Sequence, residues 1–435
     1  MLSPSSPPQA PVPVPAAGHL RTLPRFERLG VSEQFFVNLR RHTSTNLARV
    51  LVLEGAPTPR ELQVALQQLQ VRHPLLRVRI AEGLVPYYVH GEVPAPRLWV
   101  TERRSDTDYL DLLEHVLNTP LPARRGPLLE AHYVYCERTR RGELILVAEH
   151  VIGDGVSMNA LCGELVALVA RVAPSAPRQH RPVLEALLPR PAWPVRARSF
   201  AAALASFAQG ALQRARHERH PRPAATTSAY AFAELDSAQT RALIAKAREQ
   251  QTTVTGALMA AVAQAIRRLR RTSPRLALSV PVNMRPRLAT HALSAEDLGN
   301  YTGVAYLSAE PGLGHWELAR SLRAQLQRRT DALPSAVPLI YRMGNRVLRA
   351  GRPPAAHAMI SNSGVVDWGR DFGTLRVLAF RSATAAPMLS ADFALFVNTF
   401  DGRLSLNLVF AEQVVTREEA GAVLARIRAS LTEAS

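Results

Sequence analysis

The sequence is poor in cysteine and in long apolar runs. Cys136 and Cys162 are its only cysteines, and neither has a neighbour at zinc-ligand spacing. We therefore expect no disulfide framework and no metal site, and a reducing, cytoplasmic setting. No run of eighteen or more apolar residues occurs, which predicts no transmembrane helix. The first residues are rich in Pro, Ser and Ala without a charged segment before an apolar core, so residues 1–23 are predicted to form a disordered tail rather than a signal peptide.

Lysine is almost absent, because Lys246 is the only lysine among 53 basic residues. The formal net charge of +18 and the pI of about 11.1 therefore come from arginine. The arginines are scattered through the chain and are not interleaved with aromatic residues, which predicts no nucleic-acid partner. Their charge would still attract polyanions.

Several common catalytic signatures are missing, namely the Gly-x-Ser-x-Gly elbow, the Walker A loop and the dinucleotide fingerprint. Their absence gives no support for hydrolases of the nucleophile-elbow type, P-loop enzymes or nicotinamide-dependent enzymes. What is present is a globular composition, with 47% hydrophobic and 20% charged residues. The length fits two to three domain-sized units.

The most informative segment runs from Glu149 to Gly155. It follows the apolar run 144–148, which predicts a buried strand, and precedes apolar residues at helical spacing. A histidine at the end of a buried strand, here His150, sits on a rigid support and can act as a general base. Asp154, one short loop away, can pair with a basic group, and Gly155 lets a chain or substrate come close.

This segment resembles the His-His-x-x-x-Asp-Gly signature of an acyltransferase superfamily. The superfamily contains chloramphenicol acetyltransferase, the condensation domains of nonribosomal peptide synthetases, alcohol acetyltransferases and polyketide-associated acyltransferases. His150 matches the histidine that takes the proton from the acceptor, and Asp154 matches the structural aspartate. Glu149 replaces the first histidine, which the plant branch does not require. The motif alone is also compatible with a histidine satisfied inside a core.

Further segments fall in the order of the same superfamily, from about residue 25 to the C-terminus. They are residues 72–77 (Arg-His-Pro-Leu-Leu-Arg), 281–286 (Pro-Val-Asn-Met-Arg-Pro), 298–301 (Leu-Gly-Asn-Tyr) and 361–364 (Ser-Asn-Ser-Gly). The opening residues 29–36 are most similar to the alcohol acetyltransferase and polyketide-associated branch.

The resemblance implies an α/β layered fold of two chloramphenicol-acetyltransferase-like halves, with mixed sheets flanked by helices and an active-site channel between them. It also implies a salt bridge from Asp154 to Arg285. The oxyanion donor stays open between a backbone N–H near Gly155 and a side chain. Residues expected to shape the site or bind substrate are Gly155, Asn283, Arg285, Ser361 and Asn362. No cofactor is expected, since acyl-CoA or a phosphopantetheine-bound acyl group serves as co-substrate.

The predicted organisation has an N-terminal half over residues 24–173 with the His-x-x-x-Asp-Gly motif, a basic Pro-rich linker over 174–227 with one helix, and a C-terminal half over 228–435. Capping boxes predict helix starts at Thr58, Asp236 and Thr416. The linker helix is expected over residues 199–216, with Phe200, Leu204, Phe207 and Leu212 on one side. It either packs on the body or contacts a membrane surface through residues 196–222.

The sequence thus predicts an acyltransferase that moves an acyl group from a thioester donor to a hydroxyl or amine, with His150 as general base. The donor would be acyl-CoA or an acyl carrier protein, and the acceptor a small molecule or lipid. A stand-alone condensation domain acting on carrier-bound substrates is an alternative, weakened by Glu149. A non-catalytic homologue acting as a binding protein is another.

Overall fold

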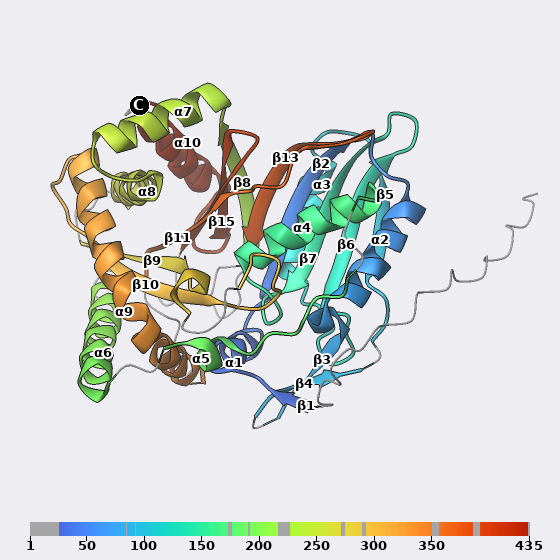
Figure 1. Ribbon diagram of the computed structural model, residues 1–435. Helices are drawn as coiled ribbons and strands as arrows, with labels where there is room; N and C mark the ends of the chain where they lie inside the picture. Colours follow the sequence, from blue (N-terminus) through green and yellow to red (C-terminus); the bar gives the residue numbers. More distant parts are fainter. Residues whose placement is uncertain are drawn as a thin grey trace, which may run out of the picture.

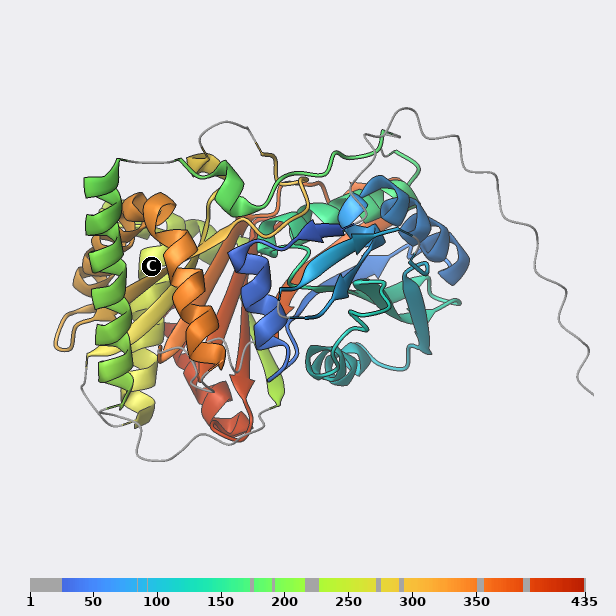
Figure 2. The same ribbon diagram turned by 90° about the horizontal axis from the view of Figure 1, so that it is seen from below.

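The structure, a computed structural model, describes residues 26–83, 85–91, 93–172, 176–189, 192–215, 227–270, 275–288, 293–349, 356–385 and 392–433. The predicted tail over residues 1–23 lies outside these ranges. Two six-stranded sheets stand side by side with helices packed on them, and a small three-stranded sheet lies at one edge (Figures 1 and 2). The predicted α/β fold of two halves with mixed sheets is confirmed.

The first large sheet has the strand order β12-β13-β2-β7-β6-β5. Its neighbours are antiparallel except for the parallel pair of β5 and β6. The strands are β2 (Asn46–Glu54), β5 (Arg97–Glu102), β6 (Leu129–Cys136), β7 (Arg141–Glu149), β12 (Asp371–Phe372) and β13 (Leu375–Thr384).

The second large sheet has the order β10-β9-β11-β14-β15-β8, in which β11 is parallel to both β9 and β14. The pair Asp401-Gly402 between two apolar runs predicts a hairpin of the last two strands. The hairpin is present, since these residues join β14 to β15 with φ values of 49° and 73°. The strands are β8 (Ser228–Leu235), β9 (Leu276–Asn283), β10 (Thr302–Ala309), β11 (Ala358–Val365), β14 (Phe393–Phe400) and β15 (Arg403–Ala411).

The remaining elements are the small sheet and the helices. The small sheet is ordered β1-β4-β3, with β1 (Phe26–Arg28), β3 (Val78–Ala81) and β4 (Tyr87–His90). The helices are α1 (Val31–Leu39), α2 (Pro59–Arg72), α3 (Asp108–Asn118), α4 (Gly155–Val169), α5 (Leu184–Leu187), α6 (Trp193–Ala215), α7 (Ser237–Glu249), α8 (Val254–Arg270), α9 (His315–Arg349) and α10 (Arg417–Glu433), with short 3-10 helices at Pro74–Arg77 and Arg285–Arg287.

The predicted helix starts are confirmed by their capping contacts. Thr58 and Glu61 form a reciprocal capping box at α2, and Asp236 and Gln239 form another at α7. At α10, Thr416 and Glu419 exchange the same two bonds. These boxes satisfy amide groups that have no partner within a helix, which is why a short local pattern can fix a helix start.

The second half contributes two strands to the sheet of the first half. Residues 371–384 fall in the predicted C-terminal half, but β13 pairs with β2 and β12 pairs with β13, so both extend the sheet of the first half. The range 174–227 contains two helices, α5 and α6, where one was expected. Because β13 pairs with β2, its polar residues Ser382 and Thr384 lie in the wall of the cavity described below.

Helix α9 was not anticipated, because Pro334 and Pro338 lie inside its 35 residues. Proline removes a backbone donor and normally ends a helix. Here the C-terminal part of α9 packs on α1, where Asn345 accepts a bond from Asn38 and donates to the Val31 carbonyl. Tertiary contacts therefore hold the helix through both prolines.

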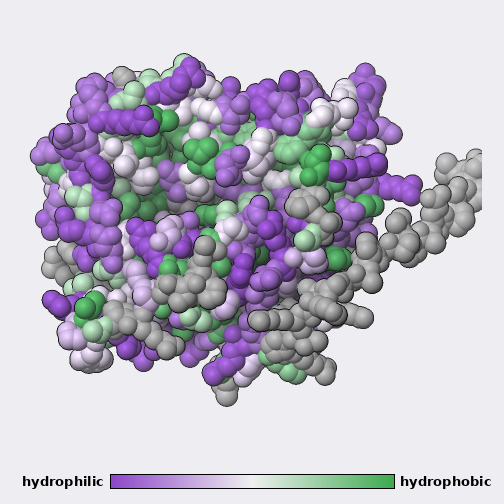
Figure 3. All heavy atoms as spheres, viewed as in Figure 1, coloured by the Kyte–Doolittle hydropathy of each residue, from purple (hydrophilic) through white to green (hydrophobic). Residues whose placement is uncertain are grey.

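The linker helix α6 begins at Trp193, earlier than expected, and packs against α9 (Figure 2). Trp193, Phe200 and Leu204 are exposed, while residues 216–222 of the predicted membrane contact lie outside the described ranges. Among the described helices, none is long and apolar enough to cross a membrane. On the face drawn in Figure 3, hydrophilic side chains predominate and hydrophobic ones form separate small areas.

Candidate active site

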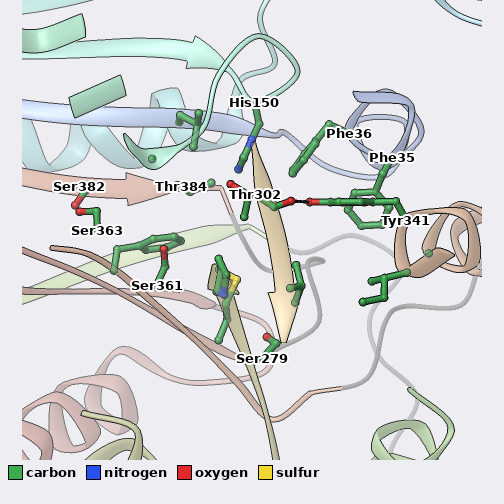
Figure 4. Close-up of a pocket in the computed structure, with 18 of the residues that line it drawn as sticks. Phe35, Phe36, His150, Ser279, Thr302, Tyr341, Ser361, Ser363, Ser382 and Thr384 are labelled. Atoms are coloured by element: carbon green, nitrogen blue, oxygen red, sulfur yellow. Dashed lines mark hydrogen bonds between the residues drawn. The ribbon is translucent and has the colours of Figure 1, made fainter. Parts of the chain in front are cut away.

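A cavity of about 110 Å³ lies between the two halves, and His150 forms part of its wall. In Figure 4 the His150 ring points into the cavity, on the side where Thr302 and Thr384 lie. Both halves contribute to the lining, as the predicted channel requires. The residues are Phe35, Phe36, Leu47, Arg49, His150, Gly155, Ser279, Pro281, Thr302, Val304, Tyr306, Ile340, Tyr341, Gly344, Met359, Ser361, Ser363, Ser382, Thr384 and Phe396.

His150 is held by backbone and aromatic contacts directly after β7. Its N–H donates to the Thr45 carbonyl over 3.2 Å. The ring of Phe36 stacks on the imidazole, with centroids 3.8 Å apart and planes within 13°. Nδ1 of His150 is buried and has no hydrogen-bond partner within the described ranges. Because Nδ1 is buried, we expect Nε2 to be the ring nitrogen that a substrate reaches.

The surroundings keep His150 neutral. Burial lowers the pKa of its imidazole to about 4, because a charged ring would lose hydration. The charge of Asp154 opposes this shift and the charge of Arg49 adds to it. A neutral imidazole can accept a proton, as a general base must.

Asp154 joins the two halves at the start of α4. One carboxylate oxygen caps the helix by accepting the N–H groups of Val156 and Ser157. The other oxygen accepts Arg285 Nη1 at 2.8 Å and the N–H of Tyr301 at 2.9 Å, both from the second half. The ion pair predicted between Asp154 and Arg285 is thus present. Burial alone would raise the pKa of Asp154, but Arg285 and these donors lower it below its usual value.

Arg285 is fixed by several acceptors besides Asp154. Its Nε donates to the Ser294 carbonyl and its Nη2 to the Asp297 carbonyl. Asn283 accepts the N–H of Arg285 at 3.1 Å and its Nη1 at 3.4 Å. Asn283 and Arg285 do not line the cavity, so they shape the loop around Asp154 from outside it.

Glu149 lies away from the cavity lining, although it precedes His150. Its side chain is fully buried, accepts a bond from the Thr45 hydroxyl and lies 3.4 Å from Nε of Arg40. Burial raises the pKa of Glu149, while Arg40 and Thr45 lower it. The residue that departs from the motif therefore occupies an internal polar pocket beside β2.

The segment 72–77 stabilises the motif helix from outside the cavity. Arg72 and His73 both contact the carboxylate of Glu164 on α4, with His73 Nε2 at 3.1 Å. Burial would raise the pKa of Glu164, but His73 and Arg72 lower it to about 2. These contacts join α2 to α4 and so support the position of Asp154.

Of the residues expected near the oxyanion, Gly155 and Ser361 line the cavity. Ser361 is labelled among the residues of the cavity wall in Figure 4. Asn362 does not line it, because its side chain donates to Thr255 and accepts the N–H of Gly364. This leaves Ser361 as the better placed of the two side chains.

Arg49, on β2, is a cavity residue that sequence reasoning missed. It is buried and donates to Asn159 at 2.6 Å, to the Ala48 carbonyl at 2.9 Å and to the Gly155 carbonyl at 3.1 Å. None of these acceptors is charged, and no carboxylate within the described residues forms a salt bridge with it. Burial lowers the pKa of Arg49 to about 10, so it remains a cation at neutral pH. The available signal in the sequence was a single charged residue within the otherwise apolar run 47–53.

Comparisons with known proteins agree with this geometry. The family model for the condensation domain matches residues 34–181, and that for the phthiocerol/phthiodiolone dimycocerosyl transferase C-terminus matches residues 224–409. The two matches follow one another along the chain and meet at the cavity. The chain belongs to the chloramphenicol-acetyltransferase-like, condensation-domain acyltransferase superfamily.

Other members of this superfamily share the fold over nearly the whole chain. Polyketide synthase associated protein 5 from Mycobacterium tuberculosis has a TM-score of 0.68 at 17% identity, covering 94% of this chain and 99% of its own. Trichothecene 15-O-acetyltransferase TRI3 from Fusarium sporotrichioides has a TM-score of 0.74 at 13% identity, covering 94% and 95%. The starter condensation domain of rhizomide synthetase, solved with C8-CoA and Leu-SNAC, has a TM-score of 0.68 at 16% identity, covering 94% of both chains.

A curated relative matches about a third of the chain. Surfactin synthase subunit 2 from Bacillus subtilis (strain 168) is 29% identical over 141 residues, which is 32% of this chain. The match spans 4% of the length of that much larger protein. The likeness therefore concerns only a small part of that protein.

Proposed function

We propose that this protein transfers an acyl group from a thioester donor to a hydroxyl or amine, with His150 as the general base. The observation that carries the proposal is a neutral imidazole in the wall of a cavity between two acyltransferase halves. Apolar side chains from both halves, including Phe35, Tyr306 and Met359, suit an acyl chain or an apolar acceptor.

The chemistry assigned to His150 is a proton transfer coupled to attack. Nε2 removes the proton from the acceptor O–H or N–H while the acceptor atom bonds to the thioester carbonyl carbon. The resulting tetrahedral oxyanion collapses, the carbon–sulfur bond breaks, and the thiolate leaves. The imidazolium then returns its proton to that sulfur. Positioning is assigned to Asp154, which fixes the loop between β7 and α4 through its bonds to both halves.

Arg49 and Ser361 are the proposed stabilisers of the oxyanion. A guanidinium has five N–H donors, and the described bonds of Arg49 use three of them. The remaining donors and the positive charge can meet an anion that forms in the cavity, where low polarity strengthens the attraction. The hydroxyl of Ser361 can add a neutral hydrogen bond from the second half.

The test is release of free thiol from acyl-CoA donors with chains of about two to sixteen carbons, in the presence of mixed alcohols and amines. We expect His150→Ala to lower the rate by about 10²–10⁴-fold, the usual contribution of a general base. His115→Ala is the matched control, because this exposed histidine on α3 lies far from the cavity lining. Equal rates for wild type and His150→Ala would refute the assignment.

A second candidate changes the donor rather than the chemistry. The condensation-domain match over residues 34–181 favours a condensation domain that takes acyl groups from carrier proteins. The basic surface suits an acidic carrier or the phosphates of CoA, but does not distinguish them. Matched acyl-CoA and acyl-carrier donors with the same chain separate the two, since transfer from the carrier alone would support the second candidate.

A non-catalytic binding role has less support. Its argument is the replacement of the first motif histidine by Glu149, and that residue does not line the cavity. The catalytic proposal is supported by His150 and Gly155 in the cavity wall and by the bond of Asp154 to Arg285. No thiol release from any CoA or carrier donor, by a correctly folded protein, would favour this alternative.

A further inference from the structure

Three side chains from distant parts of the sequence meet at the edge of the small sheet. Glu27 is the central residue of β1, and His90 ends the neighbouring strand β4. His180 comes from the segment that crosses between the halves. All three are mostly buried, with side-chain exposures of 20%, 8% and 12%. None of them belongs to the cavity described above.

The three groups point their metal-binding atoms at one place. Nε2 of His90 lies 2.8 Å from one Glu27 carboxylate oxygen, and Nε2 of His180 lies 2.9 Å from the other. One ligand atom from each residue lies within 4.8 Å of the other two. Donor atoms bound about 2.1 Å from one ion are about 3.4 Å apart in tetrahedral geometry and about 3.0 Å apart in octahedral geometry. The separations of 2.8 Å and 2.9 Å would therefore widen by roughly half an ångström or less when an ion binds.

We propose that Glu27, His90 and His180 form a binding site for a divalent transition-metal ion, with Zn²⁺ the best-matched. Two imidazole nitrogens and one carboxylate oxygen are a ligand set that zinc favours, and water would fill the open positions. The site lies outside the acyl-transfer chemistry and goes beyond the proposed function.

The location gives the ion a structural role. β1 leads directly into α1, whose Phe36 stacks on His150. The crossing segment continues from His180 to Arg181, which pairs with Asp297 at 2.9 Å. An ion bound here would join the strand before α1 to the crossing segment and so stabilise both elements against separation.

The rival explanation is a hydrogen-bonded triad in which both imidazoles donate Nε2–H to Glu27. Glutamine separates the two explanations, because its amide N–H can replace that donor but its amide is a poor ligand for zinc. We therefore choose His90→Gln and His180→Gln as test variants. His115→Gln is the matched control, since it changes an exposed histidine of α3 in the same way.

The experiment uses the full chain, treated with EDTA, exchanged into metal-free buffer and titrated with zinc chloride by calorimetry. We expect one equivalent to bind with a Kd below about 1 μM in the wild type and in His115→Gln. Free zinc at about a hundredfold excess over Kd should raise the Tm of a 435-residue chain that unfolds as one unit by about 3 °C. Both effects should disappear in His90→Gln and His180→Gln.

Thermal unfolding in EDTA checks that the test variants are folded without metal. If glutamine preserves the hydrogen bonds of the triad, the Tm of each variant should lie within about 2 °C of the wild-type Tm. Should a variant fail this check, Glu27→Gln replaces it. Cobalt(II) gives a second readout, because its visible absorption reports nitrogen and oxygen ligation. Wild type without saturable zinc binding tighter than about 10 μM, or folded variants that bind zinc like wild type, would overturn the proposal.

Discussion

The depressed pKa of His150 makes a quantitative prediction for its response to pH. With a pKa of about 4, the imidazole is about 97% neutral at pH 5.5, whereas an unperturbed histidine near 6.5 would be about 9% neutral. If His150 is the base, kcat/KM should therefore stay nearly constant from pH 7.5 to 5.5. A free histidine would lose about tenfold over the same range.

The same shift predicts a loss of stability in acid. Between about pH 6.5 and pH 4, the unfolded chain binds a proton at this histidine and the folded chain does not, so stability falls as pH falls. For a pKa moved from 6.5 to about 4, this linkage amounts to about 2 kcal/mol between pH 7.5 and pH 5. His150→Gln lacks the titrating group and should lose about 2 kcal/mol less than wild type over that interval.

Two assays check the prediction independently. Thiol release followed with 4,4′-dithiodipyridine remains usable in mild acid and gives the pH profile of kcat/KM. Urea unfolding of wild type and His150→Gln at both pH values gives the stability difference without any substrate. Two results together would refute the argument that burial keeps His150 neutral. They are a fall of kcat/KM with an apparent pKa near 6.5 and an equal pH dependence of the free energy of unfolding in the two proteins.

Two substitutions test the groups around the base. Asp154→Asn leaves Arg285 as an unpaired buried cation and should lower the free energy of unfolding in urea by about 3–5 kcal/mol. Adding Arg285→Met to the same chain should recover part of that loss. Full stability of Asp154→Asn alone would contradict the bridging role. Arg49→Met keeps an unbranched side chain in the cavity wall but removes the charge. We expect kcat to fall by about 10²–10³-fold with less effect on KM, as for loss of an oxyanion donor. An effect confined to KM would instead indicate that Arg49 binds an anionic group of the substrate.

Local signals in the sequence were sufficient for much of the fold. The capping boxes at Thr58, Asp236 and Thr416 are short patterns whose bonds are made within one helical turn. The hairpin at Asp401 likewise depends on strands that are neighbours in the chain. Such elements can be predicted because their stabilising contacts are close in the sequence.

Elements stabilised by distant contacts were not predictable in this way. Pro334 and Pro338 are stop signals, and only the packing of α9 against α1 shows why the helix continues. Gly344 on the same helix illustrates the closeness of that packing, since a Cβ there would lie 2.9 Å from the ring of Phe35. Both residues line the cavity, so missing the helix meant missing one of its walls.

The residues of the candidate site also fall into those predictable from neighbouring residues and those placed only by the fold. His150 and Asp154 are four residues apart and could be recognised together, whereas the partner Arg285 came from the family resemblance and not from any spacing. Arg49 could not be placed, because nothing local says which strand faces the other half. Glu27 and its two histidines are separated by sixty residues or more, and no short motif describes such a cluster.

The contacts of Asp154 predict that the stability and the activity of this protein depend on the same bonds. Its carboxylate caps α4 in the first half and holds Arg285 and the Tyr301 N–H in the second, so the loop carrying His150 has all its bonds only when the halves are docked. A change at Asp154 should therefore lower stability and activity together. Arg49 makes its three bonds within the first half, so its replacement should separate the two quantities. Comparing these two variants shows whether docking of the halves or charge in the cavity limits the reaction.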